Sequence, residues 1–138
     1  MGNACYIDNQ FSDIIQTREY RSPEVIINGE YDQTADMWSL ACMLFELATG
    51  DYLFDPWKGK NYKKNEDHLA LIEELIGKCQ NVSFLLSGED SENYYDKSGN
   101  LIHIKDLSFW PLKNVLSEKY RFKPDEADYF SKFLMKML

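Results

Sequence analysis

Asp67 and Glu74 are the two side chains whose spacing most clearly suggests chemistry. At about 100° per residue of a helix, they project within about 20° of each other. They lie opposite an apolar stripe formed by Leu69, Ile72, Leu75 and Ile76. Two carboxylates on one face suit the guanidinium groups of an arginine-rich ligand. A solvated helix face is the commoner origin of such a pair, so both interpretations stay open.

A second charged stretch, QTREYRSPE, occupies residues 16–24, just ahead of the most apolar segment. It holds two arginines and two glutamates around a threonine, a tyrosine and a proline. Other catalytic patterns do not stand out. His68 and His103 are isolated and match no metal-ligand spacing. The sequence contains no glycine-rich phosphate loop and no convincing Ser-His-Asp order.

Helices are the elements predicted to position these side chains. Residues 35–49 read as a helix with Thr34 as its N-cap and Gly50 after its end. This helix is apolar almost all round, which predicts a central, buried position. Residues 66–79 form a second predicted helix, capped by Asn65, after a loop over residues 51–65.

The rest of the chain gives weaker signals. Residues 1–28 read as loop with a short helical turn. The turn DKSGN at residues 96–100 is compatible with a small hairpin. Two further helices are expected to open at Pro111 and Pro124, because proline suits the first helical position.

Composition limits the classes of function. Lys and Arg total 15 against 23 Asp and Glu, so the formal net charge is −8. This balance disfavours general nucleic-acid binding and fits either a basic partner or simple solubility. The three cysteines are widely spaced and form no CxxC motif, which indicates reduced thiols in an intracellular protein. No signal peptide and no membrane-spanning apolar run is visible.

Five blocks, taken in chain order, carry a resemblance to a known family. They are GNAC at residues 2–5, QTREYRSPE, FELATGDYLF at residues 45–54, EDHLALIEELIGK at residues 66–78 and EKY at residues 118–120. Together they resemble the eukaryotic protein kinases and, more narrowly, the SR-protein kinases, which phosphorylate serines in Arg-Ser repeats. The resemblance implies a mainly α fold. It is that of an incomplete kinase C-terminal lobe with the end of the activation segment, a central buried helix and following helices.

The resemblance also implies roles for individual residues. Thr17 would steady the catalytic loop and seat the acceptor side chain, while Arg18 and Arg21 would shape the pocket beyond it and could contact a phosphoserine. Glu24 would pair with an arginine beyond the end of the chain, and Asp36 would bond the backbone of the catalytic loop. A docking groove for arginine-rich substrate segments would be lined by Asp51, Asp67, Glu74, Trp110 and Lys119. Gly2 would be the glycine of the family's Asp-Leu-Gly motif.

Residues 1–138 would therefore be a partial kinase domain, without the N-lobe, the catalytic loop and the final helix. The parent protein would use ATP and Mg²⁺ to phosphorylate Arg/Ser-rich, splicing-factor-like proteins in the cytoplasm and nucleus. It would bind neither nucleic acid directly nor a membrane. No catalytic residue or metal ligand is expected in this segment, which is predicted to be inactive alone and to self-associate through exposed apolar surface.

Three alternatives remain open from the sequence. The chain could be a non-catalytic module that binds basic peptides in the same groove. It could be the C-terminal lobe of another branch of the same kinase class. It could also be a piece of a protein with no function of its own.

Overall fold

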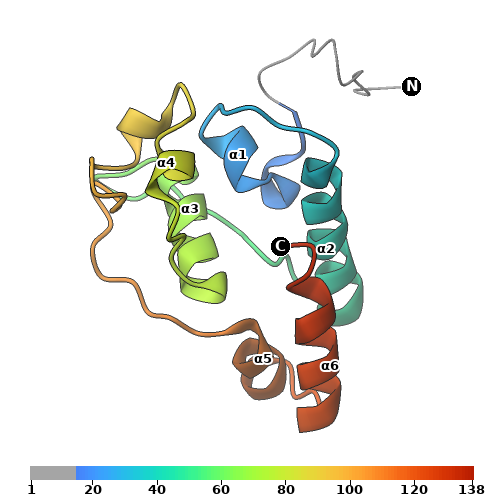
Figure 1. Ribbon diagram of the computed structural model, residues 1–138. Helices are drawn as coiled ribbons and strands as arrows, with labels where there is room; N and C mark the ends of the chain where they lie inside the picture. The colour runs from blue at the N-terminus through green and yellow to red at the C-terminus, as the bar shows by residue number, and fades with distance from the viewer. Residues whose placement is uncertain (1–14) are drawn as a thin grey trace.

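The computed structural model describes residues 15–138, which fold almost wholly into helices (Figure 1). The elements are η1 Arg18–Tyr20, α1 Pro23–Ile26, α2 Thr34–Thr49, α3 Lys64–Ile76, α4 Val82–Leu85, η2 Ser91–Asn93, α5 Leu112–Asn114, the π-helical turn η3 Val115–Lys119 and α6 Pro124–Leu134. Within these residues the β pairing is limited to one antiparallel bridge, Tyr95 to Leu101. The mainly α prediction is confirmed. Gly2 and Cys5 lie outside the described residues.

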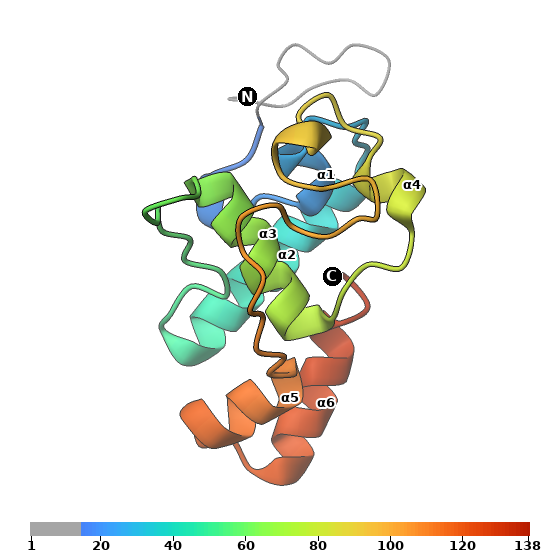
Figure 2. The same cartoon turned by 90° about the vertical axis from the view of Figure 1, so that its left-hand side faces the viewer.

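Helix α2 is central because it contributes to two separate apolar cores. Trp38 and Cys42 belong to a core shared with α1, α3 and the hairpin segment. Ala41 and Phe45 belong to a second core with α5, η3 and α6. In Figure 2, α3 crosses in front of α2, and α5 and α6 lie at the lower end of the molecule. The prediction of a central helix is therefore confirmed.

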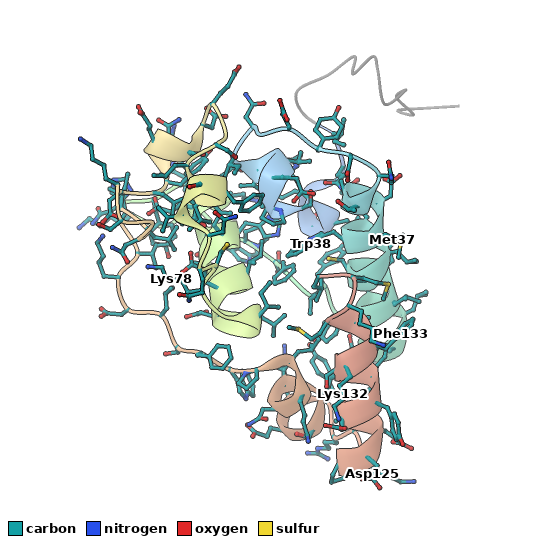
Figure 3. All side chains as sticks on the ribbon, in the orientation of Figure 1. Met37, Trp38, Lys78, Asp125, Lys132 and Phe133 are labelled. Carbon is teal, nitrogen blue, oxygen red and sulfur yellow. The ribbon has the colours of Figure 1, made fainter. Side chains whose placement is uncertain are left out.

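The expectation that α2 is buried on every side is wrong for the described residues. Met37, Leu40 and Met43 are each about two-fifths exposed, and Leu47 is 84% exposed. Figure 3 shows Met37 on the outer side of α2, whereas Trp38 points toward the interior. The two cores contact two sides of the helix, and no described element covers the third side. The apolar all-round pattern thus leaves an exposed apolar stripe.

Two N-cap predictions are also wrong. Helix α2 begins at Thr34 itself, and the Asp32 carboxylate accepts hydrogen bonds from the Thr34 N–H at 2.8 Å and its hydroxyl at 2.6 Å. Helix α3 begins at Lys64, so Asn65 lies inside its first turn. A charged oxygen two residues upstream competes well for the free amides of a helix start, which explains the shift at α2.

Several local predictions hold. Gly50 ends α2 in the left-handed region with φ +83°, a conformation that glycine adopts without steric cost. Pro124 is the first residue of α6, whose Ala127 and Leu134 are fully buried. Pro111, in contrast, lies at the N-cap of α5 and not at its first helical position. Of the helices in residues 15–138, none combines the length and the apolar character that a membrane crossing requires.

The turn at residues 96–100 closes the small predicted hairpin. The Asp96 N–H donates to the Asn100 carbonyl at 2.8 Å, and Gly99 takes φ +71°. This hairpin places the following segment against α3, where it forms one wall of the sites described next.

Candidate functional site

The loop before α1 is fastened to α2 by Gln16. Its side-chain amide donates to the Ala35 carbonyl at 2.6 Å and to the Ser39 hydroxyl at 2.8 Å. Its amide oxygen accepts the Ser22 N–H at 2.9 Å. These bonds hold Gln16 at φ +67°, which is uncommon for a residue with a side chain. Thr17, the next residue, is consequently presented on the surface.

Two arginines flank this exposed threonine. Arg18 donates through Nη1 to the Asn65 side-chain oxygen at 2.6 Å, which joins the loop to the first turn of α3. Arg21 donates through Nη2 to the Gln16 carbonyl at 3.0 Å. Partial burial, followed by the Arg18 charge, lowers the pKa of Arg21. Neither arginine forms an ion pair with a carboxylate of the described residues, so both charges remain available to an anion.

His68 lies buried beneath these arginines. It is completely inaccessible and both of its ring nitrogens lack a partner among the described residues. Burial lowers its pKa to about 3, and the charges of Arg18 and Arg21 contribute in the same direction. The imidazole is therefore neutral at physiological pH, which avoids a third positive charge under the loop.

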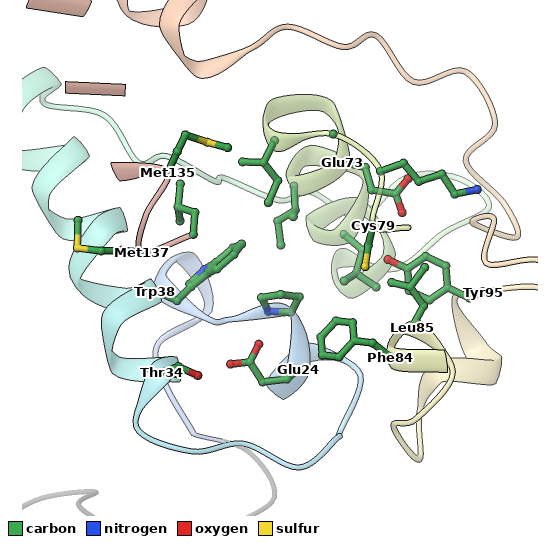
Figure 4. A pocket seen from close by; sticks show the side chains of 17 residues that line it. Glu24, Thr34, Trp38, Glu73, Cys79, Phe84, Leu85, Tyr95, Met135 and Met137 are labelled. Atoms are coloured by element: carbon green, nitrogen blue, oxygen red, sulfur yellow. The ribbon is translucent and has the colours of Figure 1, made fainter. Parts of the chain in front are cut away.

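Glu24 and Asp36 lie apart from this loop surface. Glu24 lines an apolar cavity of about 450 Å³ together with Trp38 and Met137, near the end of the chain (Figure 4). Its carboxylate has no hydrogen-bond or ion-pair partner within residues 15–138. Asp36 is exposed in the first turn of α2, and its carboxylate is likewise without a partner in the described part of the chain. The expected pairing of both residues stays a prediction.

A cleft of about 560 Å³ lies at the C-terminal end of α3. It is lined by three of the residues expected in the docking groove: Glu74, Trp110 and Lys119. Glu74 fixes the opposite wall, because its Oε1 accepts the Ser108 N–H at 2.8 Å and its carbonyl accepts the Trp110 N–H at 2.8 Å. The Trp110 indole donates to Glu118 at 2.9 Å.

Asp51 is not part of the cleft lining but contacts Lys119, which is. Its Oδ2 accepts the Tyr120 hydroxyl at 2.8 Å and lies 3.7 Å from the Lys119 ammonium. Lys119 in turn lies over the Tyr120 ring, 4.8 Å from its centroid. The hydrogen bond with Tyr120, and then the nearby charge of Asp51, raise the pKa of Lys119. Both charges are more than half exposed, so the pair is weak and screened by salt.

Asp67 does not line the cleft. It lies seven residues before Glu74 on α3, which corresponds to about 10.5 Å along a helix. Its Oδ2 accepts the Trp57 N–H at 2.8 Å. Both acids are half-buried, and each already binds a backbone amide through one oxygen. Each carboxylate therefore keeps one oxygen free for a ligand, instead of being the fully solvated group that a helical wheel suggests.

Helix α3 links the two predicted substrate-binding regions. Its first turn holds the Thr17 loop through the Arg18–Asn65 bond, and its last turn holds the cleft through Glu74. Asp67 lies between the two ends on the same helix. The Thr17 loop, Asp67 and Glu74 are thus held at successive positions of α3, whereas Glu24 faces the separate apolar cavity.

Sequence reasoning missed two residues that build this arrangement. One is Gln16, described above. The other is Glu66, which the sequence suggests is only a favourable first-turn acid. It is 2% exposed. Its Oε1 accepts the backbone N–H of His103 at 2.6 Å, and its Oε2 forms a hydrogen bond of 2.7 Å with the His103 ring Nδ1. Neither contact leaves a local signal, because the partners are separated by 37 residues.

Comparison with known proteins gives a consistent family assignment. The protein kinase domain model matches residues 1–138. Over its full length the chain is 52% identical to a serine/threonine-protein kinase SRPK of Physarum polycephalum, covering 32% of that protein. It is 49% identical to SRSF protein kinase 3 of Mus musculus, covering 24%, and 50% identical to the probable serine/threonine-protein kinase sky1 of Dictyostelium discoideum, covering 21%. The chain therefore spans at most about a third of the length of these relatives.

Proposed function

The chain belongs to the protein kinase domain family, on the branch of the SR-protein kinases, and on that premise we propose a function for the protein that carries it. That protein transfers phosphate from ATP to serines in Arg/Ser-rich proteins. Residues 1–138 contribute part of the C-terminal lobe, including the loop that meets the acceptor serine and a groove that binds arginines. The observation that carries the proposal is that Arg18, Asp67 and Glu74, all charged and none of them in an ion pair within the described residues, are held along α3.

ATP and Mg²⁺ enter this proposal only through the parent protein. Within residues 15–138, no cluster of three or more His, Cys, Asp or Glu side chains is placed to hold a metal ion. We therefore assign no step of phosphoryl transfer to these residues. When bound, Mg–ATP supplies the phosphoryl group.

The role of the described residues is to hold the substrate. Thr17 seats the acceptor serine, and the unpaired charges of Arg18 and Arg21 favour an anionic group beside it. Glu74 and Asp67 each offer one free carboxylate oxygen to an arginine of the substrate. Because these contacts are partly exposed, each is individually weak and the docking of a repeat depends on several of them.

Steady-state kinetics with an Arg-Ser repeat peptide tests the proposal. In the protein that carries this segment, Asp67→Asn combined with Glu74→Gln should raise KM and leave kcat unchanged, because the change affects docking and not the transferred group. Each carboxylate contact contributes about 1 kcal/mol, or about fivefold, and sites about 10 Å apart act independently, so the double change should raise KM about 25-fold.

A charge-matched control separates the groove from the net charge. Glu30→Gln with Glu92→Gln removes two exposed acids outside the cleft and should leave KM nearly unchanged. Raising the salt concentration should reduce the difference in KM between the two double variants, because salt screens the carboxylate contacts. Equal KM values for both double variants at low salt would contradict the groove, and absence of serine phosphorylation would contradict the proposed reaction.

A second candidate is a non-catalytic module for basic peptides. One observation favours it: the cleft, Glu74 in its lining and Asp67 on the same helix all lie within the described residues, so peptide binding does not need the catalytic parts. Calorimetry distinguishes the two. A protein that binds the repeat peptide through Glu74 and Asp67, and yet transfers no phosphate to it, would support the binding module alone.

A further inference from the structure

A polar pocket of about 520 Å³ lies beside the first turn of α3 and shares no lining residue with the cleft or the apolar cavity. Its walls come from the loop at residues 58–63, the start of α3 and the segment around η2 and the hairpin. Three lysines line it: Lys58, Lys60 and Lys63. This concentration of cations is unexpected in a chain whose net charge is −8.

The three lysines of the pocket outnumber its two carboxylates, Glu66 and Asp90. None of the three lysines forms an ion pair with Glu66 or Asp90, the two acids of the lining, or with any other acid of the described residues. Glu66 is buried and already binds His103. Asp90 accepts a hydrogen bond through Oδ1 from the side-chain amide of Asn93 at 3.2 Å. The pocket therefore favours an anionic ligand.

The lysine loop is held in shape at both ends. Its turn is closed by the Gly59 N–H, which donates to the Tyr62 carbonyl at 3.2 Å. The Tyr62 ring packs so closely on Gly59 that a Cβ at this position would overlap it. At the start of the loop, the Trp57 N–H binds Asp67 and the Trp57 ring lies 5.6 Å from the Lys64 ammonium. Little ordering of the backbone is then required when a ligand binds.

A buried neutral donor completes the pocket. Tyr94 is 7% exposed, and its hydroxyl oxygen accepts the side-chain N–H of Asn65 at 2.8 Å. Its own hydroxyl hydrogen has no acceptor among the described residues, so it remains available to a ligand. Asn65 is also the residue that binds Arg18, which connects this pocket to the loop of the acceptor serine.

We propose that this pocket binds a phosphate group, held by the ammonium groups of Lys58, Lys60 and Lys63 and by the Tyr94 hydroxyl. A phosphate monoester carries up to two negative charges and three acceptor oxygens, which suits a pocket lined by three exposed lysines and a tyrosine hydroxyl. Its source is either free phosphate or a phosphoserine, which is the product of the proposed reaction. The phosphoserine source rests on the proposed function. An Arg/Ser repeat would then place arginines at Asp67 and Glu74 along α3 and a phosphoserine in the pocket beside its first turn.

Calorimetric titration of the protein that carries this segment tests the proposal. The probes are inorganic phosphate, an Arg-Ser repeat peptide with one phosphoserine, and the same peptide unphosphorylated, all at low ionic strength. The triple variant K58Q/K60Q/K63Q should weaken binding of the phosphopeptide at least about tenfold, because charge-assisted hydrogen bonds are lost. It should leave the affinity for the unphosphorylated peptide unchanged. The control K97Q/K123Q/K136Q changes the net charge equally, at exposed lysines outside the pocket, and should behave as wild type.

A second variant tests the shape of the pocket without altering its charge. Gly59→Ala forces the Tyr62 ring aside and should weaken phosphate binding, although all three lysines remain. Equal phosphate affinity in the lysine triple variant and its control would overturn the proposal, as would an absence of phosphate binding in the wild type. If the wild-type protein bound the phosphopeptide and inorganic phosphate with equal affinity, the pocket would be supported, with free phosphate as its ligand. If the wild-type protein bound inorganic phosphate but neither peptide, the proposed function would be refuted and the phosphate pocket would not.

Discussion

Replacing Glu66 with alanine should loosen the junction between α3 and the segment that follows the hairpin. The buried Glu66 carboxylate uses both oxygens there, one for the His103 backbone N–H and one for its ring Nδ1. No other described side chain accepts that N–H. The junction forms part of the polar pocket, which both residues line. The change therefore tests whether one long-range contact sets the position of these elements.

The expected loss follows from the two bonds. A backbone N–H bonded to a charged group contributes about 1.5–3 kcal/mol, because the donor is left unsatisfied when the carboxylate is removed. The ring bond contributes less, about 0.5–1 kcal/mol, since the His103 side chain is 45% exposed. Together they give a local destabilisation of about 3 kcal/mol.

Hydrogen exchange of the His103 amide is the direct assay, because it reports local opening within a larger protein. A loss of about 3 kcal/mol corresponds to an acceleration of about 100-fold. Glu66→Gln keeps an acceptor for the N–H and should accelerate exchange by only about tenfold or less. His103→Ala removes the ring bond and leaves the backbone bond, so exchange at residue 103 should change by a few-fold at most.

The order of these three effects carries the test. If Glu66→Ala and His103→Ala accelerated exchange equally, the backbone bond would contribute nothing and the reasoning would be wrong. An acceleration below about threefold for Glu66→Ala would refute the claim that this carboxylate fixes the junction.

Four further outcomes follow from the structure. The pKa of His68 is lowered from 6.5 to about 3 in the folded state, so between these pH values the unfolded state binds one more proton than the folded state. The free energy of unfolding should therefore fall as the pH drops from 6.5 to about 3, by up to about 1.4 kcal/mol per pH unit. Urea unfolding at several pH values measures this slope, and His68→Gln should flatten it. Burial raises the pKa of Cys42 to about 12, so iodoacetamide at pH 8 should label the partly exposed Cys79 first, and mass spectrometry showing equal rates would contradict this. Gly50→Ala should cost about 1 kcal/mol in urea unfolding from backbone strain alone, because the space around its Cβ position is open. Expressed alone, residues 1–138 should self-associate in sedimentation velocity, and Leu47→Lys should reduce this; a monomer with unchanged behaviour in the variant would contradict the role of the exposed α2 stripe.

Local patterns in the sequence determined most of the secondary structure. The position of α2, its end at Gly50 and the start of α6 at Pro124 depend on propensities and caps that act within a few residues. The same holds for the turn at residues 96–100. The family assignment also came from the sequence, because ordered blocks of residues retain it independently of any contact.

The sequence predicted the candidate site only in part. The common face of Asp67 and Glu74 follows from helical periodicity, since both lie on α3. The sequence could not show that each carboxylate already binds a backbone amide from a distant loop. It also could not show that Glu74, rather than Asp67, lines the cleft, because the cleft depends on where the segment around Trp110 lies. The substrate roles of these residues remain predictions.

Tertiary packing alone decided which surfaces are buried and which charges are paired. An apolar helix is buried only where another element covers it, so α2 keeps an exposed stripe that its composition did not predict. Glu66 became a buried junction and Lys58, Lys60 and Lys63 became the wall of a pocket, although all four resemble ordinary surface residues in the sequence. The physical reason is that burial and long-range hydrogen bonds depend on which segments meet in space, whereas periodicity and propensity act only along the chain.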